Sequence, residues 1–175
     1  KQKNVVVVAC AISAQESSSL LNIACQALKD LPEVEFWVKP HPYLRIKDLL
    51  RHGGIDVKNI PFIIKDQPIE EVLTQSSIVI VGESSVSLEA LALGCSVVIV
   101  NVPEWMNMSP VKDVQSHMIQ TVNNPQQLRA HILGIINSKK EDPSSRAQVE
   151  SVIKKFFDLD FTSNEPKEFL KLLAP

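Results

Sequence analysis

Residues 77–94 read SIVIVGESSVSLEALALG, and the organisation of the whole chain can be worked out from this stretch. Its first part, 78–81, is an unbroken run of isoleucine and valine, which is typical of a strand covered on both faces within a parallel sheet. Gly82 ends the run, a short and almost wholly apolar segment follows, and a second β-branched run occupies 97–100. We therefore predict a strand–turn–helix–strand unit, in which the helix starts at the carboxyl end of a buried strand.

Two serines stand in the turn of this unit. Ser84 and Ser85 belong to the residue types that cap helix N-termini, and Gly94 suits a left-handed backbone at the helix end. A helix start offers free N–H groups and a positive dipole, which favour phosphate. Glu89 does not have capping-box spacing from either serine, so its carboxylate is expected to have another polar partner. By itself the stretch fits a phosphate site and a plain structural unit equally well.

Strand-like apolar runs recur along the chain and are separated by segments with helical periodicity. They lie at 5–9, 35–38, 62–64, 78–81, 97–100 and 118–122. This alternation predicts a doubly wound parallel sheet of the Rossmann-like α/β class. With right-handed crossovers, the first five strands take the order 3-2-1-4-5 and the sixth lies at an edge. We assign residues 1–138 to this domain, and 139–175 to C-terminal helices that pack on it or on a missing N-terminal half.

The C-terminal segment has an apolar pattern of its own. One helix carries a single stripe made of Val152, Ile153, Phe156 and Phe157. We expect these side chains to be largely buried. A last helix is expected over 165–173, where Phe169 and Leu170 indicate a surface that packs against another domain. Because the chain begins almost directly with a strand, we also expect it to be one domain of a longer protein.

Composition and charge argue against several classes of function. A net charge of −2 over 175 residues gives no general basic field for nucleic acid. We find no apolar run long enough for a membrane span and no signal peptide before the first strand. The three cysteines, Cys10, Cys25 and Cys95, lack metal-ligand spacing and lie in apolar surroundings. An odd number of buried thiols indicates packing roles in a reducing compartment, so we expect a cytoplasmic protein.

Polar side chains follow several of the predicted strands. Ser13 follows the first strand, Lys39 and His41 follow the second, and residues 84–85 follow the fourth. Ligands of doubly wound sheets bind outside the carboxyl ends of the strands, where the strand order reverses. We therefore expect these side chains to share one site. Ser13 also has the spacing of a capping box with Glu16.

Each candidate residue has a binding interpretation and a structural one. His41 stands between Pro40 and Pro42, which hold it extended. It can donate a ring N–H to a phosphate oxygen, with Lys39 adding charge, or it can be a turn histidine satisfied by the backbone. The two serines can bind phosphate or only cap the helix. Glu89 can accept two hydrogen bonds from a ribose diol or can form a salt bridge.

Motifs of the common enzyme classes are absent from the sequence. There is no Ser-His-Asp order, Walker loop, zinc-ligand pattern or G-x-G-x-x-G fingerprint. His52, His117 and His131 show no metal spacing and are expected at surface or boundary positions. We predict no metal ion and no cofactor, and the sequence identifies no catalytic residue.

Two segments together resemble the donor-nucleotide half of GT-B glycosyltransferases. They are KPHP at 39–42, and GESS at 82–85 continued by SLEALALG at 87–94. The His-Pro and Ser-Ser pairs are similar to those of bacterial sialyltransferases and polysialyltransferases, Kdo transferases of capsule synthesis, and glycerophosphotransferases that use CDP-glycerol. EALALG is shared more widely among GT-B enzymes. The resemblance covers about residues 4–138, and 143–175 is similar to the tail helices that cross back toward the other half.

This resemblance implies that His41, Ser84 and Ser85 hold the donor phosphate and that Glu89 lies near the ribose. It implies a nucleotide-sugar donor, linked to CMP or CDP, in the synthesis of a surface polysaccharide such as capsule or O-antigen. The acceptor half that precedes the donor half in this family is missing from the chain. The full-length protein would be a glycosyltransferase, peripheral to the inner membrane, whereas the isolated chain should transfer little or nothing.

Two other interpretations stay open. A UDP-sugar 2-epimerase uses the same fold with a helix-start serine or glycine and a glutamate, although this chain lacks Gly-Gly before the helix and has His-Pro. A non-enzymatic Rossmann domain that binds a nucleotide or a partner is the second alternative. It is suggested by the 103–110 loop, where Trp105 and Met106 stand among polar residues.

Overall fold

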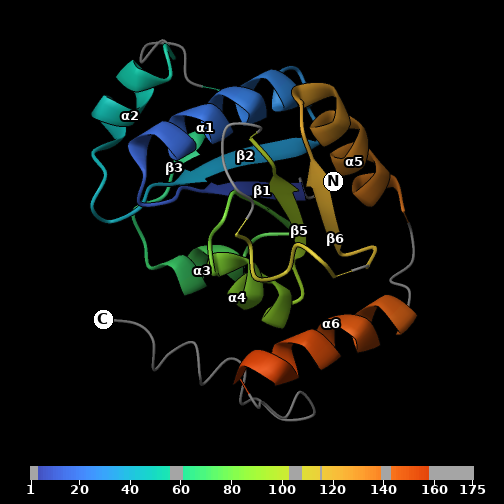
Figure 1. Ribbon diagram of the computed structural model, residues 1–175. Coiled ribbons are helices and arrows are strands. Elements are labelled where there is room, and N and C mark those ends of the chain that lie inside the picture. The colour runs from blue at the N-terminus through green and yellow to red at the C-terminus, as the bar shows by residue number, and fades with distance from the viewer. Residues whose placement is uncertain (1–3, 56–60, 103–107, 115, 139–142, 158–175) are drawn as a thin grey trace.

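The computed structural model describes residues 4–55, 61–102, 108–114, 116–138 and 143–157, and contains one parallel sheet (Figure 1). Its strands are β1 (Asn4–Ala9), β2 (Val34–Lys39), β3 (Ile63–Ile64), β4 (Ile78–Val81), β5 (Ser96–Val100) and β6 (Ile119–Val122). The order β3-β2-β1-β4-β5-β6 confirms the predicted topology, with the sixth strand at an edge. The strand order reverses between β1 and β4, at the centre of the sheet.

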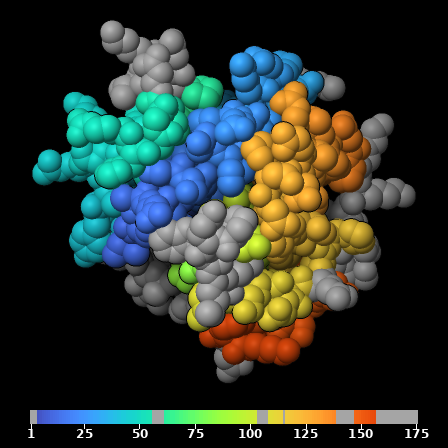
Figure 2. All heavy atoms as spheres, turned by 45° about the horizontal axis from the view of Figure 1, so that its top comes forward, coloured from blue at the N-terminus to red at the C-terminus, as the bar shows by residue number. Residues whose placement is uncertain are grey.

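Helices cover both faces of the sheet. They are α1 (Ala14–Leu28), α2 (Ile46–His52), α3 (Ile69–Leu73), α4 (Val86–Ala92), α5 (Pro125–Asn137) and α6 (Pro143–Phe157). Figure 1 shows α1, α2 and α5 on one face and α3, α4 and α6 on the other. In the space-filling view, α1 lies between α2 and α5 and contacts both (Figure 2). The architecture is therefore the three-layer, doubly wound arrangement expected from the sequence.

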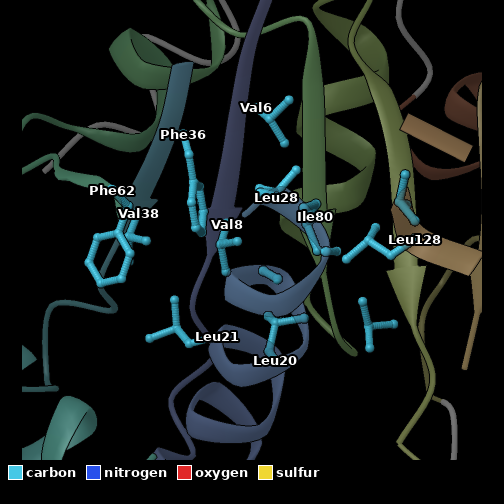
Figure 3. Close-up of a cluster of buried hydrophobic side chains, with 14 of the residues drawn as sticks. Val6, Val8, Leu20, Leu21, Leu28, Phe36, Val38, Phe62, Ile80 and Leu128 are labelled. Carbon is cyan, nitrogen blue, oxygen red and sulfur yellow. The ribbon is translucent and has the colours of Figure 1, made fainter. Parts of the chain in front are cut away.

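The unbroken β-branched strands are buried on both sides. Successive side chains of a strand point to opposite faces. Val8 and Ile80 accordingly pack under α1, as Figure 3 shows, whereas Val7 and Val79 belong to the core beneath α3 and α4. All four are fully inaccessible to solvent. Burial on both faces explains why these strands carry no alternating polar residues.

Helix ends match the sequence signals at several places. The Ser13 hydroxyl accepts the Glu16 N–H, and the Asn124 side chain accepts the Gln127 N–H at 2.9 Å. Gly94 has the left-handed φ of 82° after α4, so a side chain there would be strained. Arg129 of α5 donates to two carbonyls at the end of α1, which fixes these two helices together.

The prediction for the stripe on α6 is correct in part. Ile153 is buried and Val152 is half-buried, both against the core that contains α4, but Phe156 is 52% exposed. The 15 residues of α6 extend about 22 Å, while the seven residues of α4 extend only about 10 Å. Helix α6 is therefore about twice as long as the helix that it packs on, so α4 can cover only part of it. The Phe157 side chain and residues 165–173 lie outside the described part of the chain.

Lowering the pH from about 7.5 to 5.5 is expected to destabilise the fold through His131 of α5. Burial lowers the pKa of this imidazole below its ordinary value of 6.5, and its Nε2 has no hydrogen-bond partner in the described part of the chain. The unfolded chain therefore binds more protons than the folded chain as the pH falls below about 6.5, and stability is lost in that window. Urea unfolding at both pH values should show a smaller loss for His131→Leu than for the parent.

His117 provides the control for this measurement, because its side chain is exposed. The variant His117→Leu should keep the loss of stability that the parent shows between the two pH values. If His131→Leu also kept it, the imidazole of His131 would not contribute to the pH dependence.

Candidate functional site

The candidate site lies at the carboxyl edge of the sheet, where the loops after β1, β2 and β4 meet. The end of β1 is joined to the end of β2 by a hydrogen bond from the Cys10 N–H to the Lys39 carbonyl oxygen, at 3.0 Å. The first turn of α1, which follows β1, is joined to the β4–α4 turn by a hydrogen bond from the Glu83 N–H to the Glu16 carboxylate, also at 3.0 Å. The structure thus connects Ser13, Lys39 and the serine turn through backbone and carboxylate contacts.

The two serines of the β4–α4 turn have different roles. The Ser84 hydroxyl oxygen accepts the Val86 N–H at 3.2 Å, and the Ser87 hydroxyl donates to the Ser84 carbonyl at 2.9 Å. Ser85 has helical backbone angles, is exposed, and makes no side-chain capping hydrogen bond. Of the two serines, only Ser84 therefore shows the side-chain hydrogen bond of the capping interpretation. The start of α4, after β4, lies at the carboxyl edge of the sheet, where ligands of this sheet class bind.

One ring nitrogen of His41 is used by the turn that follows β2. Its Nδ1 accepts the Tyr43 N–H at 3.3 Å, while its carbonyl accepts the Leu44 N–H at 2.9 Å. The structural interpretation of His41 is thus correct for Nδ1. A neutral imidazole that accepts through Nδ1 carries its proton on Nε2. Within the described residues Nε2 has no hydrogen-bond partner, so it can donate to a ligand.

The relative positions of His41 and Ser84 follow from the sheet. Strands β2 and β4 lie on either side of β1, so their ends are separated by two strand spacings, or roughly 10 Å. No hydrogen bond joins His41 directly to either serine in the described part of the chain.

Glu89 lies on the first turn of α4 and is half-buried. Burial raises the pKa of its carboxyl group, and the Glu70 carboxylate of α3 raises it further. The described residues contain no cation paired with Glu89, so the salt-bridge interpretation is not supported. A half-buried carboxylate without a cation suits hydroxyl donors better than it suits a phosphate.

Glu16 is the site residue whose role the sequence did not indicate correctly. Its N–H donates a hydrogen bond to the Ser13 hydroxyl, as the capping box predicts. Its carboxylate, however, accepts the Glu83 N–H across the edge of the sheet, instead of the Ser13 N–H that a capping box requires. Gly82 is the other residue that could have indicated this contact, because a glycine at the end of the strand leaves space for the Glu16 carboxylate. Neither Glu16 nor Gly82 indicates the contact alone, because the two residues are far apart in the sequence.

The cysteines are packing residues, as predicted. Burial raises the pKa of the Cys10 thiol to about 12, although a hydrogen bond with Ser17 and the charge of Lys39 act in the opposite direction. Burial also raises the pKa of Cys95 to about 12 and that of Cys25 to about 11. All three are free thiols and would be protonated near neutral pH, which makes them poor nucleophiles.

The described residues contain neither a metal-binding cluster nor a membrane-spanning helix. Within the described ranges, no group of three or more histidine, cysteine, aspartate or glutamate side chains could hold a metal ion. Of the six described helices, none has both the length and the apolarity that crossing a membrane requires.

Solved structures with the same arrangement include several glycosyltransferases. The calicheamicin glycosyltransferase CalG4 matches with a TM-score of 0.60 and 15% identity, over 98% of this chain and 41% of that one. The fold is that of one half of a GT-B glycosyltransferase. This confirms the predicted resemblance at the level of the fold, and the chain spans less than half the length of CalG4.

Two further matches differ in function. The C-terminal CMP-Kdo binding domain of WaaA from Acinetobacter baumannii has a TM-score of 0.59 and 14% identity, over 88% of this chain and 91% of that one. The UDP-GlcNAc 2-epimerase from Neisseria meningitidis has a TM-score of 0.58 and 13% identity, over 90% of this chain and 45% of that one. No protein-family model and no curated protein sequence matches the chain.

Proposed function

We propose that this chain is the donor half of a GT-B glycosyltransferase and binds a nucleotide-sugar at the carboxyl edge of its sheet. The observation that carries the proposal is the structural match, over 88% of this chain and 91% of the other, to the C-terminal CMP-Kdo binding domain of WaaA. The site adds support. His41 keeps Nε2 without a hydrogen-bond partner among the described residues, Ser85 is exposed at the start of α4, and Glu89 has no cation partner in the same part of the chain.

We extend the proposal to a cytidine-linked donor used in the synthesis of a surface polysaccharide. This part depends on the resemblance of 39–42 and 82–94 to cytidine-using transferases. The acceptor half would come from a segment outside this sequence, and the complete enzyme would work in the cytoplasm, peripheral to the inner membrane. Ser13 and Lys39 would border the donor phosphate, and no metal ion or cofactor takes part in the proposed binding.

The alternative is a UDP-sugar 2-epimerase domain, because structures from two such enzymes also match the chain. The sequence favours the transferase, since it has His-Pro and lacks Gly-Gly before α4. Both proposals predict nucleotide binding at the same edge, and they differ in the base that is preferred.

Titration calorimetry with CMP, CDP, UDP and GDP is expected to show preferential binding of the cytidine nucleotides. Cytidine without phosphate is the matched control and should bind at least about tenfold more weakly, because charge-assisted hydrogen bonds to phosphate are lost. A preference for UDP would instead support the epimerase. Absence of binding for all four nucleotides would contradict both enzymes and leave a Rossmann domain with another partner.

A further inference from the structure

The Glu16 carboxylate is the contact that ties α1 to the β4–α4 turn. It accepts the Glu83 N–H at 3.0 Å, although the two residues are 67 positions apart. The same N–H lies in the turn that carries Ser84 and Ser85. We propose that Glu16 is a positioning residue, which sets the conformation of this turn for phosphate binding; this inference rests on the proposed function.

Gly82 supplies the space that the contact needs. A Cβ atom at this position would collide with Oε1 of Glu16, and would lie 3.2 Å from its Cδ and 3.5 Å from its Cγ. Gly82 does not have a positive φ, so its backbone conformation is open to other residues. The glycine is therefore needed for the close approach of Glu16.

Helix α1 is a firm support for this carboxylate. Its first turn is capped by the Ser13 hydroxyl, which accepts the Glu16 N–H. Farther along, Ser18 donates to the Leu49 carbonyl of α2, and Arg129 of α5 donates to carbonyls at the end of α1. A turn bonded to Glu16 is thus held by a helix that is itself fixed on both sides.

The charge of Glu16 argues against direct contact with the ligand. A carboxylate near a phosphate repels it, so this side chain can assist binding only through the N–H that it orients. Glutamine keeps an acceptor oxygen in the same place without the charge. The variant Glu16→Gln should therefore preserve the turn, whereas Glu16→Ala should release it.

Affinity for CMP in the full chain tests the proposal. We expect Glu16→Ala to weaken binding about tenfold and Glu16→Gln to remain within about threefold of the parent. Gln15→Ala is the control, because Gln15 is the exposed neighbour on α1 and should leave the affinity unchanged. Equal weakening by the alanine and glutamine variants, or none by alanine, would overturn the proposal.

A double-mutant cycle with Gly82→Ala supplies the second test. In the parent, Gly82→Ala should weaken CMP binding and lower the melting temperature, because the new methyl group meets the carboxylate. In Glu16→Ala the colliding atoms are gone, so the same substitution should have little further effect. Equal losses in both backgrounds would contradict the contact. If the parent binds no nucleotide, the proposed function fails, while the melting temperatures still decide whether Glu16 sets the turn.

Discussion

Replacing Ile80 by alanine is expected to lower the free energy of unfolding by about 2–5 kcal/mol. Ile80 lies in β4, between β1 and β5, and is fully inaccessible to solvent. Its side chain packs under α1 beside Val8 and Leu20 (Figure 3). Truncation removes buried methyl groups and leaves a cavity that the flanking strands cannot close. For a chain of this length the melting temperature should fall by roughly 5–15 °C.

Ile63→Ala is the matched control, because it deletes the same atoms from an edge strand. Ile63 is 48% exposed in the two-residue strand β3, so its loss should cost at most about 1 kcal/mol. Urea unfolding of both variants measures the difference. Similar losses at the two positions would show that β4 is not the centre of the core.

The sheet could be predicted because its signals are local and redundant. Unbroken β-branched runs such as 78–81 identify strands that are buried on both faces, and intervening helices then require parallel pairing. Right-handed crossovers reduce the remaining choices of strand order to very few. The predicted strand order did not depend on any single residue, which explains why it was correct for all six strands.

The details of the site could be predicted less well, because they depend on contacts between distant segments. The Ser13–Glu16 spacing indicated a cap, but only the folded sheet brings Glu83 close enough to compete for the carboxylate. The proximity of Glu70 to Glu89 likewise arises from the packing of α3 beside α4. Phe156 follows the right periodicity, yet its side chain is 52% exposed in the folded chain. Sequence periodicity identifies the apolar face of a helix, but it does not show how much of that face another element covers.

His41→Ala is expected to weaken the binding of CMP by roughly tenfold to a hundredfold. Each hydrogen bond to a charged phosphate contributes about 1.5–3 kcal/mol, and the substitution removes the Nε2–H donor. The stability of the fold should change little, since His41 lies in a loop and its Nδ1 makes a single long hydrogen bond, at 3.3 Å. Calorimetry with CMP, together with a thermal melt of each variant, measures both effects.

Two polar substitutions separate the roles of the two ring nitrogens. Asparagine places an acceptor near the position of Nδ1, so His41→Asn can keep the Tyr43 N–H bond while it removes the donor at Nε2. Glutamine reaches farther and can place an N–H donor near the position of Nε2. If the phosphate is bound by Nε2, His41→Asn should bind CMP as weakly as His41→Ala, and His41→Gln should recover part of the affinity.

The opposite pattern would assign His41 to the turn alone. In that case His41→Asn would bind CMP as tightly as the parent, because the loop after β2 would keep its shape without the imidazole. His52→Ala is the control for general effects of losing a histidine, since His52 is exposed at the end of α2. Because the asparagine variant retains the hydrogen bond that the structure shows and lacks only the one that we propose, its affinity decides between the two roles.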